Sequence, residues 1–398
     1  MLDVHERSHF VRCCMQGKFL PPVALVLFTL TSRVLCRGDV YFADDPHLIR
    51  CILEKAYIIQ PPGYWLFNRI AGLFTDPVIA ISVMNIMFSV AGVVVFYYTA
   101  VFFAGRTSAF IAALAYSSIF YIWFSGEIYS THASQILFPV ALFCVLLHYE
   151  RNKASWKLWL AAVIFAVGAG LRPSDGAFLV PMLLYYSVVR LPWRKAIPFL
   201  ALSMALCLTC VIPTWFAYQS HKRVLGMDQS AVGMQDIKAH MWMMMTYRSI
   251  LAGVNSNSMA NVVRYFLPLL VAFFPILSVA ILNLARNWKD WRLQLMFLWI
   301  VPGSLFFIFS YMGNAAYLNF LSAAILLLAV GAPRRMAVTA AWNVLLFLSV
   351  APIPSHRLAV NVWNCYVVEY SRYGIQHQWW PFLGRLQQGI PDATGPQQ

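Results

Sequence analysis

The chain has 398 residues, of which 61% are apolar and 11% are charged, about half the charged fraction of a soluble domain. With a mean hydropathy of +0.66, this composition excludes an ordinary soluble enzyme and predicts an all-α polytopic membrane protein. The net charge of +14 would suggest nucleic-acid binding in a soluble protein. Because Lys and Arg mostly occupy short linkers between apolar runs, we interpret them as topology signals and expect no nucleic-acid partner.

Apolar runs in chain order predict eleven membrane-spanning helices, each about as long as a bilayer crossing requires. These runs cover residues 19–36, 77–104, 107–124, 131–149, 157–171, 176–190, 196–218, 264–285, 293–311, 315–332 and 336–353. We expect one membrane domain over residues 1–353 and a short outer tail over 354–398.

The distribution of basic residues predicts the sidedness of these spans. One set of alternating linkers carries Arg151, Lys153, Lys157, Arg190, Arg194, Lys195, Arg286, Lys289, Arg292, Arg334 and Arg335. The opposite short linkers carry only Arg172. The positive-inside bias therefore places the first set and the N-terminus in the cytoplasm. The segments 37–76, 219–263 and 354–398 then lie outside, where we expect function, because long loops on a rigid scaffold commonly carry it.

The first outer loop holds the densest acidic cluster, formed by Asp39, Asp44 and Asp45 and followed by His47. Asp45 precedes a proline, so an alternative role for it is to cap a short interfacial helix. Leu48, Ile49, Ile52 and Leu53 would form the apolar face of that helix.

Residues 63–74 follow a rigid Pro-Pro break and are too short to span, so they predict a second interfacial helix. Asp76 then precedes Pro77, which is typical of a helix cap at the start of the next span.

An acidic pair after the first span, a short helix and a Pro-Pro-aromatic break resemble the GT-C superfamily of lipid-carrier-dependent glycosyltransferases. The resemblance is closest to the protein O-mannosyltransferase and aminoarabinose-transferase-like branch. The motif stands here as Asp44-Asp45 and Gln60-Pro61-Pro62-Gly63-Tyr64, where the family typically has Asp-Glu and Tyr/His-Pro-Pro-Leu-Tyr. Weaker similarities are Glu127 before the fourth span, Arg172 after the fifth and Tyr317 opening the tenth.

The resemblance implies an inverting transferase that moves a sugar from a polyprenyl-phosphate carrier to a glycan, lipid or protein acceptor. In that family the first-loop Asp at the position of Asp44 is the general base, and Asp45 is its acidic neighbour. Asp39, His47, Tyr64, Glu127 and Tyr317 become candidate substrate-binding residues.

Such a transfer also needs a cation beside the departing phosphate, because negative charge develops there as the bond breaks. Arg172 is the leading candidate. Alternative roles for Arg172 are a simple ion pair with Asp175 and contact with a lipid headgroup. Alternatives for the cation are Lys222, Arg223, Arg248 and Arg264 in the second long loop.

Two further features stay open at this level. Asp44, Asp45 and His47 would also suit Mg²⁺ or Mn²⁺, so a divalent cation is an alternative cofactor. Cys36 and Cys51 flank the polar stretch at the start of the first outer loop and could form a disulfide in an oxidising compartment.

The alternative functions are a polytopic transporter and a non-catalytic protein that binds polyprenyl lipid. Coupled transporters usually place ionisable groups near the bilayer midplane. Here Arg33, Glu127, Arg172 and Asp175 fall near the outer ends of spans, which favours a transferase. We expect a multi-pass protein of the plasma or inner membrane with its site on the outer or periplasmic face, or of the endoplasmic reticulum in a eukaryote.

Overall fold

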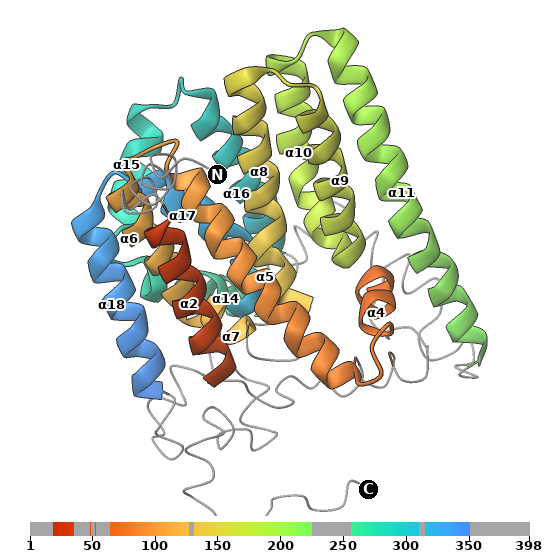
Figure 1. Cartoon of the computed structure of the whole chain (residues 1–398), viewed down its shortest axis with the longest axis horizontal. Coiled ribbons are helices and arrows are strands. Elements are labelled where there is room, and N and C mark those ends of the chain that lie inside the picture. Colours follow the sequence, from red (N-terminus) through yellow and green to blue (C-terminus); the bar gives the residue numbers. More distant parts are fainter. Residues whose placement is uncertain are drawn as a thin grey trace, which may run out of the picture.

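The structure, a computed structural model, describes residues 19–35, 48, 52, 64–126, 131–224, 256–309 and 315–350. Within these residues the regular structure is entirely helical, which confirms the predicted all-α class (Figure 1). The α-helices are α2 (Leu20–Leu35), α4 (Trp65–Ala71), α5 (Pro77–Ala100), α6 (Arg106–Ser118), α7 (Phe120–Ser125), α8 (Ser134–Asn152), α9 (Trp156–Leu171), α10 (Pro173–Arg190), α11 (Trp193–Val224), α14 (Ser256–Phe273), α15 (Leu277–Arg286), α16 (Trp291–Phe309), α17 (Asn319–Ala329) and α18 (Pro333–Val350). Two short 3₁₀ helices, η1 (Thr131–Ala133) and η2 (Ala315–Leu318), precede α8 and α17.

Every predicted span coincides with a helix or with two consecutive helices. Among the described residues, four helices are individually long and apolar enough to cross a membrane, and one bent pair raises this number to five. Leu20–Val34, Trp156–Leu171 and Ala316–Ala329 are shorter apolar helices. The total of eleven spans therefore stays a prediction.

Two predicted spans, 107–124 and 264–285, are wrong as continuous helices. The second consists of α14 and α15, whose axes differ by 95°. Pro275 lies between them and cannot continue a helix, and it also disfavours helical geometry at the residue before it. The first consists of α6 and α7, which are separated at Ile119, a residue with extended backbone angles (φ −53°, ψ 123°).

Buried polar side chains contact the backbone groups at both of these breaks. At the α6–α7 break, Arg33 Nη2 donates to Ser117 O at 2.6 Å, and the backbone N–H of Phe120 donates to Asn343 Oδ1 at 3.3 Å. The Asn343 amide also donates to Ala272 O at 2.9 Å, in the last turn of α14. These contacts follow the general rule that buried backbone groups released from a helix find other partners.

The predicted interfacial segment 63–74 contains α4, which packs beside the start of α5. Asp76 caps α5 as expected, since its Oδ1 accepts hydrogen bonds from Val78 N at 2.8 Å and Ile79 N at 3.2 Å. Leu48 and Ile52, on the predicted apolar face of the preceding helix, are both buried in one cluster with α4.

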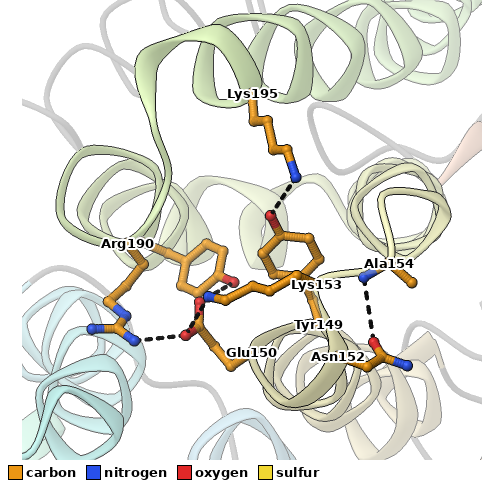
Figure 2. A network of polar contacts seen from close by, with 8 residues as sticks. Tyr149, Glu150, Asn152, Lys153, Ala154, Arg190 and Lys195 are labelled. Carbon is orange, nitrogen blue, oxygen red and sulfur yellow. Dashed lines mark hydrogen bonds and ion pairs between the residues drawn. The ribbon is translucent and has the colours of Figure 1, made fainter.

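Linkers with the same predicted sidedness lie at the same end of the helices. Figure 2 shows this for the α8–α9 and α10–α11 linkers. Glu150 Oε2 lies 2.8 Å from Lys153 Nζ and 2.6 Å from Arg190 Nη2, and Lys195 Nζ donates to Tyr149 Oη at 3.4 Å. We call this end, which carries the basic linkers, the inner end, and we call the opposite end the outer end, after their predicted sides.

Candidate functional site

Polar side chains from four separate segments meet at the outer end, and all of them are buried except those of Tyr64 and Tyr317, which are half-buried. We call them the outer-end cluster. Its members come from the residue before α4, from η1 and the first turn of α8, from the α9–α10 junction, and from η2 with the start of α17. They are Tyr64, Thr131, His132, Gln135, Arg172, Asp175, Tyr317 and Asn319.

Arg172 occupies the junction between α9 and α10. Pro173 forces the break, because it starts α10 and leaves Arg172 with extended backbone angles (φ −147°, ψ 94°). The residue is only 2% exposed, and its Nη1 donates to Thr131 Oγ1 at 2.8 Å. The turn between two helices therefore holds a guanidinium group inside the protein.

Two aromatic rings flank this guanidinium group. Its carbon lies 5.1 Å from the ring centre of Tyr317 and 5.7 Å from that of Tyr64, within the range of cation–π contact. Burial lowers the pKa of Arg172, but its interactions with Tyr64, Asp175 and Tyr317 outweigh that effect, so the pKa stays above its usual value. The group is positively charged at any physiological pH.

Asp175, in the first turn of α10 and 4% exposed, is the carboxylate of the cluster. Its Oδ1 lies 3.5 Å from Arg172 Nε and accepts a shorter hydrogen bond, 2.7 Å, from Gln135 Nε2. The ion pair that was the alternative interpretation of Arg172 is therefore present. The distance of this ion pair exceeds that of a hydrogen bond with good geometry, and among the described residues Arg172 Nε has no hydrogen-bond partner.

The hydrogen-bonded chain continues from Asp175 to a histidine. Because Gln135 turns its amide nitrogen to the carboxylate, its Oε1 faces His132 Nδ1 at 3.3 Å, and this oxygen can only accept. The geometry therefore assigns the proton to His132 Nδ1. The His132 ring packs edge-on against Tyr317, with ring centres 4.7 Å apart.

Asn319 links the cluster to α7. Its amide donates to Ser125 Oγ at 2.8 Å and to His132 O at 3.3 Å. Its Oδ1 is buried and has no hydrogen-bond partner among the described residues, so an acceptor atom is available beside the cluster.

A second buried arginine lies near this end. Arg33, in the last turn of α2, is fully buried and lies over the Trp123 ring at 5.1 Å from the ring centre. Gly126 passes so close that a Cβ atom there would be 3.0 Å from Arg33 Nε, so only glycine fits this position without a shift.

The predicted site residues divide into two groups. The structure brings Tyr64, Arg172 and Tyr317 together, although they are far apart in the sequence. Asp39, Asp44, Asp45, His47, Glu127 and Arg248, with the cysteines Cys36 and Cys51, lie outside the described residues. The proposed ligands for a divalent cation, Asp44, Asp45 and His47, belong to this second group. Among the residues that the structure does describe, no three metal-binding side chains lie together.

Sequence reasoning missed Thr131, Gln135 and Asn319 as members of the cluster and left His132 unassigned. The signal that was present is the spacing of His132 and Gln135, three residues apart at the start of a predicted span, which puts both on one helix face. Asn319 had no comparable signal, since its partners come from segments more than 180 residues away.

The chain is similar to known proteins in sequence over one segment and in overall structure. Residues 60–217 match the family model of dolichyl-phosphate-mannose-protein mannosyltransferases. This segment, less than half of the chain, begins at the Pro-Pro-aromatic motif and includes Tyr64, Gln135, Arg172 and Asp175. No curated protein matches the chain in sequence.

In overall structure the chain resembles ArnT from Cupriavidus metallidurans, which was crystallised bound to undecaprenyl phosphate. The TM-score is 0.59 at 16% sequence identity, and the match covers 93% of this chain and 78% of ArnT. The chain has the GT-C fold. A more distant match, with a TM-score of 0.47 and 10% identity, is to the oligosaccharyltransferase of Archaeoglobus fulgidus and covers 89% of this chain and 57% of that one.

The GT-C fold and the family match together confirm the resemblance seen in the sequence and support a glycosyltransferase of the GT-C type. The apolar helices and this membrane-enzyme fold indicate an integral membrane protein. The matched family segment also contains Arg172 and Asp175, the two charged members of the outer-end cluster.

Proposed function

We propose that this chain transfers a sugar from a polyprenyl-phosphate carrier to an acceptor at the outer end of the bundle, with inversion at the anomeric carbon. The family match supports the transfer reaction. The carrier is supported by the neighbour ArnT, whose structure was determined with undecaprenyl phosphate bound. Inversion follows from the GT-C resemblance of the first-loop motif.

The observation that carries this proposal is the buried Arg172 guanidinium. When the sugar–phosphate bond breaks, negative charge develops on the departing phosphate, and a preorganised guanidinium in a site that excludes water stabilises it. Arg172 suits this role because its guanidinium group donates a hydrogen bond to Thr131 and is flanked by two tyrosine rings, which fix its position. The long contact to Asp175 leaves room for a second anionic partner.

The acceptor must lose a proton as it attacks the anomeric carbon. We propose that the Asp44 carboxylate accepts this proton as the general base. The acceptor oxygen or nitrogen forms the new bond, the sugar–phosphate bond breaks, and its electron pair leaves with the carrier phosphate. A positioned base typically contributes a factor of about 10² to 10⁴ in rate. Asp45, Asp39, His47, Glu127 and Arg248 stay candidates for binding donor or acceptor.

The test is sugar transfer by the purified chain in liposomes that contain lipid-linked sugars. Mass spectrometry of glycans and lipid-linked sugars from cells with and without the gene first identifies donor and acceptor. We expect Asp44→Asn to lower the transfer rate at least about 100-fold, because the base is lost. Asp76→Asn is the matched control, since Asn also caps a helix.

Transfer by Asp44→Asn at the wild-type rate would reject Asp44 as the base. A wild-type chain that binds the carrier but transfers no sugar would reject the enzyme and favour the non-catalytic alternative.

A further inference from the structure

A hollow of about 720 Å³ opens at the inner end, on the opposite end of the bundle from the outer-end cluster. We call it the inner-end groove. The turn between α15 and α16 forms one wall, and the residues that follow α5 and α17 contribute Phe103 and Gly331 to the others. A Cβ atom on Gly331 would meet nothing within 4 Å, which agrees with open space at this position.

The groove is positively charged. Arg286, Lys289 and Arg292 line it, and Asp290 is its one acidic lining residue. Asp290 is already engaged, since Arg292 Nε lies 3.0 Å from both of its oxygens. Burial raises the pKa of Asp290, but its hydrogen bonds from Arg292 prevail and lower it, so the carboxylate stays charged at neutral pH.

Arg286 and Lys289 remain unneutralised, because neither forms an ion pair in the part of the chain that the structure describes. The groove therefore combines positive charge with space for a compact anion.

The surroundings indicate that this anion is carried by a lipid. On α15, just before the groove, Ile281 and Leu282 are 58% and 50% exposed, as expected for a face that contacts acyl chains. Trp288, which lines the groove, is 45% exposed and packs edge-on against Phe297 at 4.9 Å between ring centres. Exposed tryptophan beside Lys and Arg at the end of an apolar helix is typical of the headgroup layer.

We propose that the inner-end groove binds the phosphate headgroup of an anionic glycerophospholipid, with Arg286 and Lys289 contacting the phosphate and the acyl chains lying along α15. Basic pockets between helices at the cytoplasmic side are known sites for such headgroups. The site is separate from the outer-end cluster and does not depend on the proposed transfer reaction.

Native mass spectrometry of the full chain in a nonionic detergent tests this proposal, with dioleoyl phosphatidylglycerol as the probe and dioleoyl phosphatidylcholine as the zwitterionic comparison. We expect the double variant Arg286→Gln, Lys289→Gln to bind phosphatidylglycerol about 30-fold more weakly, because each surface cation contributes roughly a fivefold gain in affinity. The matched control, Arg151→Gln with Arg194→Gln, removes two exposed cations that do not line the groove and should bind like wild type.

A second variant, Gly331→Leu, keeps every charge but fills the groove, and we expect it to weaken phosphatidylglycerol binding as well. Equal affinity of wild type and the double Gln variant would overturn the proposal. Phosphatidylcholine binding as tightly as phosphatidylglycerol would also overturn it. Displacement of the lipid by an equal concentration of inorganic phosphate would identify a free-anion site and reject the lipid.

Discussion

Asn343 shows how a single side chain can stabilise two irregular positions. Its Oδ1 accepts from Phe120 N at the α6–α7 break, while its amide nitrogen donates to Ala272 O near the α14–α15 bend. The residue is fully buried, so water cannot replace these bonds. It lies in an apolar run of the sequence that gave no indication of this role.

Replacement of Asn343 by Leu should lower the free energy of unfolding by about 1–3 kcal/mol, because buried backbone groups lose a partner. Thermal unfolding of the purified chain in detergent measures this change. Thr107→Leu, at an exposed position of α6, is the control and should change stability by less than about 0.5 kcal/mol. Equal unfolding temperatures for the two variants would show that Asn343 does not stabilise the α6–α7 and α14–α15 breaks.

The candidate site was only partly predictable from single residues. Arg172 could be identified because it is the one basic residue in the short outer linkers, and linker charge is visible in sequence. Its aromatic neighbours, Tyr64 and Tyr317, came only from family resemblance. Gln135 and Asn319 belong to the site through hydrogen bonds between segments far apart in the chain. A single sequence does not show which distant segments come into contact.

Among the elements, α5 and α8 approach each other closely at Gly92. A Cβ atom there would lie 2.6 Å from Ile136 O, the same oxygen that accepts a hydrogen bond from Tyr116 Oη at 2.8 Å. Small residues allow such close approach between helices in membranes, where packing replaces the hydrophobic effect as the main attraction. The register of α5 against α8 therefore depends on this glycine.

Gly92→Ala should destabilise the chain by about 1–3 kcal/mol, the usual cost of overpacking a rigid interface. The measurement is the shift in the midpoint of thermal unfolding. Gly331→Ala provides the control, because an added Cβ atom there would have nothing within 4 Å and its backbone lies outside the left-handed region. An unchanged midpoint for Gly92→Ala would show that the two helices can separate at no cost.

At the element level, apolar runs located the helices well, since the length and composition of a run reflect burial in protein or lipid. They failed at the two breaks for different reasons. Pro275 is visible in the sequence and was a usable warning of the bend between α14 and α15. The break at Ile119 has no Pro or Gly nearby, and Arg33 and Asn343, which contact the backbone on its two sides, come from α2 and α18.

For the whole molecule, charge separates the two ends. The inner end gathers the basic linkers around Glu150 and around the inner-end groove, whereas the outer end keeps Arg172 and Arg33 buried. The positive-inside bias then predicts which end faces the cytoplasm. The position of Arg172 relative to an outward-facing carrier depends on this orientation.

Substituted cysteines test the orientation. In sealed right-side-out vesicles, a membrane-impermeant maleimide should modify Arg69→Cys, at an exposed position of α4, and should reach Lys289→Cys only after permeabilisation. Peptide mass spectrometry distinguishes these positions from the native cysteines. Modification of Lys289→Cys in intact vesicles, with Arg69→Cys protected, would reverse the predicted sidedness.

The central claim is that Arg172 binds the carrier phosphate in addition to pairing with Asp175. Arg172→Met alone leaves a buried carboxylate unpaired and should cost about 3–5 kcal/mol of stability, whereas Arg172→Met with Asp175→Leu should recover most of that loss.

The decisive measurement is undecaprenyl phosphate binding by the stability-restored double variant, with exposed Arg69→Gln as the control. We predict that the double variant binds about 10- to 100-fold more weakly than wild type while the control binds normally, because a charged hydrogen-bonding partner of the phosphate is gone. Wild-type affinity in the double variant would show that Arg172 serves only to pair with Asp175 and would contradict the proposed site.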